Sequence, residues 1–295
     1  MAVVTRIRSG LGNQLFCYAA GRALAHRLGT SLILDCTRSH PDWTVRLDRY
    51  AIDARFLHDG PSNIRDRYFK LQRRYGTLVA EVHRAFPRTV RVEGRAFRIF
   101  EERHPFTYER KFGSVRGPIY LNGYWQSFRY FESAWPIIRA ELQPKVDLTE
   151  RNKGWLEKIV SSRHSICLHV RRGDYLKTEF GLCSLAYYEN AAATMRDRVG
   201  GDATFFVFSD DLSWCRRHLP ISDIVFVEGN ESDPVSELLL MTACRHHIVA
   251  NSTFSWWAAW LGSHPEQVVI APDPWISIVS ICPDLIPSTW IKLAR

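Results

Sequence analysis

The second half of the chain alternates short apolar segments with longer segments in which apolar residues recur at helical spacing. This alternation restricts the fold more than any other feature, because apolar strands that alternate with helices form a parallel sheet covered on both faces. We predict strands at residues 165–170, 203–208, 223–227, 247–250 and 267–271. We predict helices at residues 185–198, 212–219, 234–244 and 254–261. This half is therefore expected to be an α/β domain.

The first residues follow the same pattern. A strand is predicted at 3–8, a tight turn at 9–12, a helix at 13–28 and a second strand at 31–36. This order is the opening of a doubly wound α/β domain. Between residues 42 and 112 the periodicity is lost, and only loosely packed helices or substrate-facing loops can be assigned there.

A length of 295 residues favours two domains of similar size over one large core. A helix predicted at 131–142 is followed by a polar run at 143–152, which contains Pro144 and is the candidate linker. We expect one Rossmann-like domain at residues 1–150 and another at 151–295. A cleft between the carboxyl ends of their strands would then hold the ligand.

The charge balance points to an anionic partner. The 39 Lys and Arg residues exceed the 31 Asp and Glu residues, which gives a formal net charge of +8. Nucleic acid, an acidic membrane surface and an anionic small substrate are the candidates. The arginines are dispersed, without the basic run that is typical of nucleic-acid binding.

The cysteines and the apolar runs indicate where the protein works. Seven cysteines without a Cys-x-x-Cys pair fit neither a disulfide framework nor a zinc ribbon, so we expect a reducing compartment. The sequence shows neither a signal peptide nor the roughly 20 apolar residues that cross a bilayer, so we expect a soluble cytoplasmic protein. No Asp-x-Asp pair occurs, and Cys244, His246 and His247 are interpreted as packing residues instead of metal ligands.

Two adjacent arginines, Arg171 and Arg172, follow a predicted strand and precede Gly173. They cannot both point into an apolar sheet, and the planar guanidinium suits bidentate pairing with phosphate oxygens. The alternative is an exposed turn held by salt bridges.

A second predicted strand ends in Ser209, Asp210 and Asp211. Carboxylates at such an end can accept hydrogen bonds from a ribose or from the N1 and N2 donors of guanine. Asp211 could instead cap the helix that starts at residue 212.

A third strand turns directly into a helix through Ser252, Thr253, Phe254 and Ser255. Free N–H groups and the helix dipole make this turn a candidate anion site, and the alternative is an ordinary helix cap. The sequence also gives Asn251 a formal glycosylation motif, which we disregard because the residue ends an apolar run.

The turn near the start contains Gly10 and Gly12 but has Leu15 where a dinucleotide fingerprint needs its third glycine. No phosphate-binding loop of the nucleotide-triphosphate type occurs either, so NAD and ATP are disfavoured. The glycines still allow a close approach of the backbone to a ligand, with Asn13 and Gln14 at the helix start.

Together, residues 10–16, 169–175, 208–211 and 251–261 resemble the motifs of the α-1,2-fucosyltransferase family, particularly its bacterial members, and they occur in the family's order. The resemblance implies a GT-B fold, GDP-β-L-fucose as donor, an inverting mechanism without a required metal, and a galactoside acceptor in surface polysaccharide synthesis. It also implies that the first domain binds the acceptor and the second binds GDP-fucose.

The resemblance implies roles for individual residues. Arg171 would pair with the β-phosphate of GDP and stabilise the leaving group, and Asn13 would reach the donor from the other domain. His169 and Asp210 would hold the guanosine end. The diphosphate would lie at the helix start in the fourth motif, residues 251–261. The further positions assigned to donor binding are Gly12, Gln14, Arg172, Ser209, Asp211, Ser252, Thr253, Phe254 and Ser255.

The base that deprotonates the acceptor stays open between two carboxylates. Asp174 lies in the motif, where it could serve only to orient Arg172. Glu179 lies ten residues after His169, a position where the related α-1,6-fucosyltransferases carry a glutamate base. Departure of GDP could also lead the reaction without a strong base.

Other functions stay open beside this one. A fucosyltransferase of different linkage or with a protein acceptor would share the motifs, and a basic α/β protein without activity could bind nucleic acid. The arginines between Arg46 and Arg116 exceed what a diphosphate needs, so we expect a loose attraction to an anionic inner membrane that carries a lipid-linked acceptor.

Overall fold

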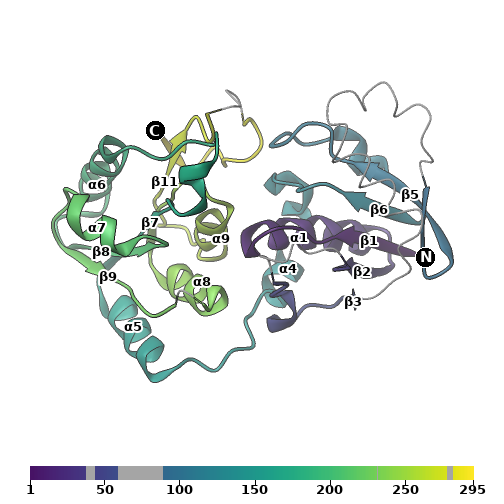
Figure 1. Cartoon of the computed structure of the whole chain (residues 1–295), viewed down its shortest axis with the longest axis horizontal. Coiled ribbons are helices and arrows are strands. Elements are labelled where there is room, and N and C mark those ends of the chain that lie inside the picture. The colour runs from purple at the N-terminus through teal and green to yellow at the C-terminus, as the bar shows by residue number, and fades with distance from the viewer. Residues whose placement is uncertain (38–43, 59–88, 231, 278–281) are drawn as a thin grey trace. The chain divides into compact units, whose positions relative to one another are not determined.

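The computed structural model describes residues 1–37, 44–58, 89–230, 232–277 and 282–295, and these divide into two compact units (Figure 1). The N-terminal unit comprises Met1–Val45 and Ile52–Glu141. The C-terminal unit comprises Arg46–Ala51 and Leu142–Arg295. Each unit is built on a six-stranded sheet with an order typical of doubly wound folds.

The sheet of the N-terminal unit has the order β3-β2-β1-β6-β5-β4, and only β4 runs antiparallel to its neighbour. The strands are β1 (Ala2–Arg6), β2 (Ser31–Asp35), β3 (Arg55–Leu57), β4 (Thr89–Val92), β5 (Arg95–Glu101) and β6 (Ile119–Asn122). The helices are α1 (Leu11–Arg27), α4 (Trp135–Glu141) and the short 3₁₀ turns η3 (Arg110–Ser114), η4 (Phe128–Tyr130) and η5 (Glu132–Ala134).

Helix α1 begins at Leu11 instead of residue 13, because the N–H groups of Asn13 and Gln14 both donate to the Gly10 carbonyl at 3.0 and 3.1 Å. Its packing on β1 depends on Gly21. A Cβ at this position would lie 2.1 Å from Oγ1 of Thr5, so only glycine allows the helix to lie this close to the strand.

The region expected to be irregular differs from the prediction where it is described. Strand β3 and the hairpin β4–β5 lie in it, with the turn at Glu93 and Gly94, both of which have positive φ. Residues 42–43 and 59–88 of that region lie outside the described residues.

The C-terminal unit has a parallel sheet of order β12-β11-β10-β7-β8-β9. Its strands are β7 (His164–Val170), β8 (Ala203–Ser209), β9 (Ile224–Phe226), β10 (His246–Ile248), β11 (Val269–Asp273) and β12 (Ile291–Ala294). Its helices are α5 (Glu150–Ser161), α6 (Leu185–Val199), α7 (Leu212–His218), α8 (Pro234–Ala243) and α9 (Thr253–Leu261), with the turns η1 (Leu47–Arg49) and η6 (Asp174–Lys177). All five strands and four helices predicted for this half are present, and β12 and α5 are additional.

Helices cover both faces of this sheet. Met195 of α6 and Cys215 of α7 pack in one core cluster with Leu168 and Val170 of β7. On the opposite face, a ring nitrogen of His247 lies 3.0 Å from the carbonyl of Met241 in α8. We call these sides the α7 face and the α9 face, and Figure 1 shows α6 and α7 on the other side of the strands from α8 and α9.

The predicted linker is partly helical, because Thr149 caps α5 by accepting from the N–H of Asn152 at 3.2 Å. The units divide after Glu141, earlier than the expected boundary at residue 150. The segment Arg46–Ala51 belongs to the C-terminal unit, where Arg49 pairs with Asp233 at 2.6 Å.

Further expectations from the sequence concern the cysteines, the glycosylation motif and membrane-spanning segments. All seven cysteines are free, and Asn251 is only 1% exposed, which confirms that its glycosylation motif is buried. Among the described residues, no helix has both the length and the apolar character needed to cross a bilayer.

Candidate active site

Polar side chains gather where three neighbouring parallel strands of the C-terminal unit end. Strands β10, β7 and β8 lie side by side in the sheet, and their carboxyl ends therefore share one edge. His169 is in β7, and Arg171 and Arg172 follow that strand. Asp210 and Asp211 follow β8, and the turn from β10 into α9 adds Ser252 to Ser255. The predicted placement of these residues at the carboxyl ends of strands is confirmed.

The alternation of side chains along a strand separates the two arginines. Leu168 and Val170 face α6 and α7, so His169 lies on the α9 face, where its ring is 6.1 Å from that of Phe254. Arg171 continues the α9 face, and Arg172 continues the α7 face.

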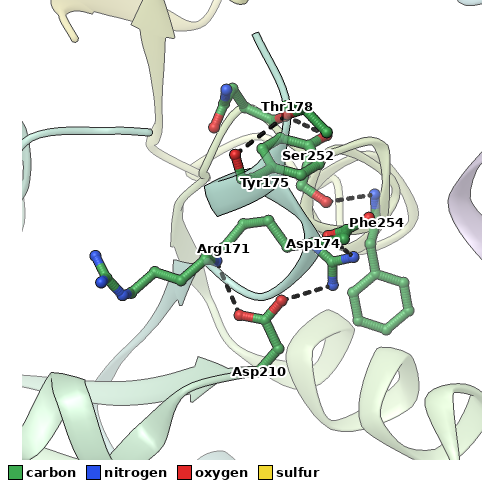
Figure 2. A network of polar contacts seen from close by, with 9 residues as sticks. Arg171, Asp174, Tyr175, Thr178, Asp210, Ser252 and Phe254 are labelled. Atoms are coloured by element: carbon green, nitrogen blue, oxygen red, sulfur yellow. Dashed lines mark hydrogen bonds and ion pairs between the residues drawn. The ribbon is translucent and has the colours of Figure 1, made fainter. Parts of the chain in front are cut away.

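Arg171 is held by two carboxylates and a ring. Its Nη1 lies 3.0 Å from Oδ2 of Asp210, and its Nη2 lies 2.6 Å from Oδ1 of Asp174. Figure 2 shows the guanidinium joined to both carboxylates, and its central carbon lies 5.5 Å from the ring centroid of Tyr175. The side chain keeps 25% exposure, so a fixed cation is presented at the sheet edge. Of the two roles left open for Asp174, orientation of Arg172 is wrong, because Asp174 pairs with Arg171.

Arg172 lies against helix α7. Its Nε is 3.3 Å from Oδ2 of Asp211, and its guanidinium stacks 3.8 Å from the ring centroid of Trp214. Its backbone N–H donates to Oδ1 of Asp210 at 2.9 Å. The capping interpretation of Asp211 is confirmed, since it accepts from the backbone N–H of Trp214 at 3.0 Å, and the same carboxylate pairs with Arg172.

Ser209 and Asp210 complete the turn after β8. The hydroxyl of Ser209 accepts from the N–H of Asp211 at 2.9 Å, so it orders the start of α7. The Asp210 carboxylate contacts the guanidinium of Arg171 and the backbone N–H of Arg172, so it is already paired with one cation and one backbone donor.

His169 is buried and keeps an unsatisfied ring atom. The residue is 3% exposed, and its Nδ1 has no hydrogen-bond partner among the described residues. Burial, assisted by the charge of Arg171, lowers its pKa to about 3. The ring is therefore neutral at pH 7 and can donate or accept a hydrogen bond without adding charge.

The hydroxyls of the fourth motif, residues 251–261, mostly build the start of helix α9. Ser252 accepts from the N–H of Phe254 at 3.3 Å, and the buried Ser255 hydroxyl donates to the Ser252 carbonyl at 3.2 Å. Thr253 and Phe254 are partly exposed in the first turn of α9. The turn thus has the cap geometry of the alternative reading, and its first-turn N–H groups stay near the sheet edge.

Asn251 holds the segment after Arg171, a role that the sequence did not indicate. The carbonyl of Asn251 accepts from the Tyr175 hydroxyl at 3.1 Å, and its side-chain amide donates to the Gly181 carbonyl at 2.8 Å. Glu179 lies between these two anchors and is exposed. In the sequence, Asn251 is marked by the three-residue glycosylation motif that it begins, but in the structure its role is to anchor this segment.

The residues expected from the first motif belong to the N-terminal unit. Gly12 is buried inside α1, and Gln14 is 1% exposed because its amide donates to the carbonyls of Ser9 and Thr44 at 2.8 and 3.0 Å. Asn13 is partly exposed and accepts from the amide of Gln126 at 2.5 Å.

The residues that were considered for a metal have packing partners. Nδ1 of His246 accepts from the N–H of Val268 at 3.1 Å, and the thiol of Cys244 points to the carbonyl of Leu240 at 3.8 Å. Within the described residues, no group of three His, Cys, Asp or Glu side chains could hold a metal ion.

Comparison with known proteins identifies the family. Residues 103–277 match the model of Glycosyl transferase family 11. The chain is 31% identical to an alpha-1,2-colitosyltransferase of Escherichia coli, and the alignment covers 99% of both proteins. It is 30% identical to the galactoside 2-alpha-L-fucosyltransferase SEC1 of Bos taurus over 48% of this chain and 42% of that protein.

Solved structures agree on the fold. The fucosyltransferase NodZ from Bradyrhizobium superposes with a TM-score of 0.52 at 15% identity, covering 87% of this chain and 91% of that one. A structure of NodZ, an alpha-1,6-fucosyltransferase, soaked with GDP-fucose gives a TM-score of 0.50 at 16% identity with the same coverage. These neighbours are GT-B enzymes, which confirms the predicted fold class. The family that the four motifs predicted is confirmed as well: the chain belongs to glycosyl transferase family 11 and is a glycosyltransferase of GT-B fold.

Proposed function

We propose that this enzyme transfers L-fucose from GDP-β-L-fucose to the 2-hydroxyl of a galactoside, with inversion at the sugar carbon and without a required metal. The observation that carries the proposal is the fixed Arg171 guanidinium at the end of β7, beside a neutral and unsatisfied His169. The family supplies the reaction class, and the strand end supplies a cation where a diphosphate needs one.

In this reaction the acceptor oxygen attacks C1 of fucose, the bond from C1 to the β-phosphate oxygen breaks, and GDP leaves. Negative charge develops on that phosphate oxygen in the transition state. Arg171 would stabilise it with N–H groups that are already oriented by Asp174 and Asp210, so little reorganisation is needed. A fixed guanidinium can do this work in place of a divalent metal, which is why we expect activity in EDTA.

The acceptor proton needs a base, and we assign this role to Glu179. Asp174 is paired with Arg171 at 2.6 Å, so its carboxylate already orients the cation that the leaving group needs. Glu179 is exposed at the tip of the segment anchored by Asn251. It is free to approach an acceptor that arrives from solvent.

The donor site is assigned to the C-terminal unit, where every candidate residue except Gly12, Asn13 and Gln14 lies. We assign binding of the acceptor to the N-terminal unit. A protein acceptor or another linkage would use the same donor site, so product analysis has to distinguish them. Family membership favours all of these over a nucleic-acid-binding protein without activity.

Colitose is the second candidate for the transferred sugar. One relative that aligns with nearly the whole chain is a colitosyltransferase, whereas the bovine fucosyltransferase aligns with about half of it. Colitose is fucose without the 3-hydroxyl. A site that hydrogen-bonds this hydroxyl rejects the deoxy sugar by about 10⁴-fold or more, but an apolar site discriminates only weakly against the hydroxyl. The ratio of kcat/KM for the two GDP sugars therefore decides between them.

The experiment that tests the proposal is GDP release by the purified chain from GDP-fucose in EDTA, with a panel of terminal galactosides, followed by NMR of the product. Acceptor-dependent release and an α-1,2 linkage are expected. Release that needs a metal, or activity only with an unrelated nucleotide sugar, would contradict it.

A peripheral membrane contact is the last part of the proposal. Arg91, Arg98 and Arg116 are exposed, and their guanidinium groups donate to the backbone carbonyls of Gly94, Arg116 and Val115. These cations would be attracted to anionic lipid. Flotation with liposomes that contain about 30% anionic lipid should recover more protein than flotation with neutral liposomes, and equal recovery would remove the contact.

A further inference from the structure

We propose that Arg172 and Trp214 form a positioning pair that sets the geometry of Arg171 and does not touch the donor. This inference rests on the proposed function, because it assigns a role within the same site. It separates two adjacent arginines that the sequence treats alike, one as a contact to the diphosphate and the other as part of the framework behind it.

The side chains of Arg171 and Arg172 lie on opposite faces of the sheet. Strand β7 ends at Val170, which packs on the α7 face, and Arg172 continues that face two residues later. Arg171 lies between them and continues the α9 face, which also carries His169 and Phe254. A cation on the α7 face points away from the helix start of α9, where the diphosphate is expected.

Arg172 already has partners on the α7 face. On the α7 face its Nε lies 3.3 Å from Oδ2 of Asp211, and its guanidinium stacks 3.8 Å from the centroid of the Trp214 ring. The side chain is 17% exposed, against 25% for Arg171. To reach the start of α9, Arg172 would have to leave Asp211 and Trp214 and turn to the other face of the sheet, whereas Arg171 already lies on the α9 face at the open edge.

The connection to Arg171 runs through Asp210. The backbone N–H of Arg172 donates to Oδ1 of Asp210, and Oδ2 of the same carboxylate accepts from Arg171. Gly173 makes the turn tight enough for this, since a Cβ there would lie 2.6 Å from Oδ2 of Asp210. Anchoring the Arg172 side chain to α7 therefore fixes the backbone that holds Asp210, and Asp210 fixes the guanidinium that serves the leaving group.

Trp214 can anchor Arg172 because it is itself fixed by the helix cap. The backbone N–H of Trp214 donates to Oδ1 of Asp211, and Oδ2 of that aspartate holds Arg172. One carboxylate thus sets the start of α7 and the position of the arginine together. A stacked ring adds a preference for the flat guanidinium that an aliphatic side chain lacks.

The test is a double-mutant cycle with Arg172→Ala, Trp214→Leu and the combination. The readouts are kcat and donor KM with GDP-fucose, and the Kd of GDP by calorimetry. Because a small displacement of a catalytic group is costly, each single variant should lower kcat about tenfold, and the double variant should lose no more than either. The Kd of GDP should change less than about threefold, because the phosphate contact through Arg171 remains.

Trp214→Phe keeps a stacking ring and should retain kcat within about twofold of the parent, which separates the stack from a general effect on folding. Arg216→Ala is the matched control, since Arg216 also lies on α7, stacks 4.3 Å from the Phe226 ring and pairs with Glu228. It removes the same charge and the same kind of stack without contact to the site, so its kcat should be unchanged.

Two outcomes would overturn the inference. Additive losses in the double variant would mean that the two residues act independently. A weakening of the GDP Kd by more than about tenfold in Arg172→Ala, with Trp214→Leu unaffected, would make Arg172 a direct phosphate ligand. Failure of the parent protein to bind GDP or release it from GDP-fucose would instead contradict the proposed function, so the two failures are distinguishable.

Discussion

The two faces of the C-terminal sheet use the same residue types for different purposes. On the α9 face, one arginine shares two carboxylates and lies near a buried histidine with an unsatisfied nitrogen. On the α7 face, the next arginine has one carboxylate and a tryptophan ring and is less exposed. An arginine that carboxylates orient at an open edge can present its remaining N–H groups to an anion. An arginine that a ring and a helix cap enclose is part of the framework.

Removing the cation of the α9 face should have the largest effect. Arg171→Ala should lower kcat by about 10³-fold, because one preorganised donor to a developing charge contributes roughly 10²- to 10³-fold. Arg171→Lys should recover little, since an ammonium cannot span Asp174 and Asp210 in the same way. The Tm should fall by only a few degrees at this partly exposed residue. A parent-like kcat would remove Arg171 from the mechanism.

The two carboxylates considered as the acceptor base should differ in size of effect. Glu179→Gln should lower kcat about 10²-fold, the lower range for loss of a general base. Asp174→Asn should cost about tenfold, because Asp210 still holds the guanidinium. Steady-state rates with a galactoside acceptor measure both. If Asp174→Asn proves the more damaging change, the base role passes to Asp174.

The α9 face should also determine how stability depends on pH. His169 and His247 both have a pKa lowered to about 3, chiefly by burial, so they stay neutral in the folded protein while the unfolded chain binds protons below about pH 6.5. Stability is therefore complete above pH 6.5 and is lost as the pH falls toward 3. Each histidine contributes a slope of about 1.4 kcal/mol per pH unit.

Urea unfolding at pH 7, 6 and 5 measures this slope in the parent and in His169→Gln. The variant should lose about 1.4 kcal/mol per pH unit of the dependence below pH 6, because one buried histidine is gone. Parallel curves for the two proteins would show that His169 takes up its proton in the folded state as readily as in the unfolded chain.

The sequence predicted the sheet edge but not its division into two faces. Arg171, Arg172, Asp210 and Asp211 could be assigned to strand ends because apolar runs precede them. Their partners depend on the register of β7 with β8, in which Val170 lies opposite Ser209, and a sequence alone does not contain this register. The pairing of Asp174 with Arg171 instead of Arg172 likewise depends on which face of the sheet each arginine occupies.

The N-terminal unit was harder to predict for a local reason. The hairpin β4–β5 alternates apolar and polar residues around Glu93 and Gly94, a turn signal that could have identified it. Its many arginines instead suggested irregular loops. Helix α5 was overlooked because Pro144 suggested a linker, although Thr149 and Glu150 are typical of a helix start.

The central claim is that Arg171 serves the β-phosphate of GDP, and calorimetric titration of GDP and GMP tests it most directly. We predict that the parent protein binds GDP at least about tenfold more tightly than GMP, as expected for a charge-assisted contact to the extra phosphate. Arg171→Ala should bind the two nucleotides with similar affinity, and Arg172→Ala should keep the preference. A preference for GDP that survives in Arg171→Ala would contradict the claim.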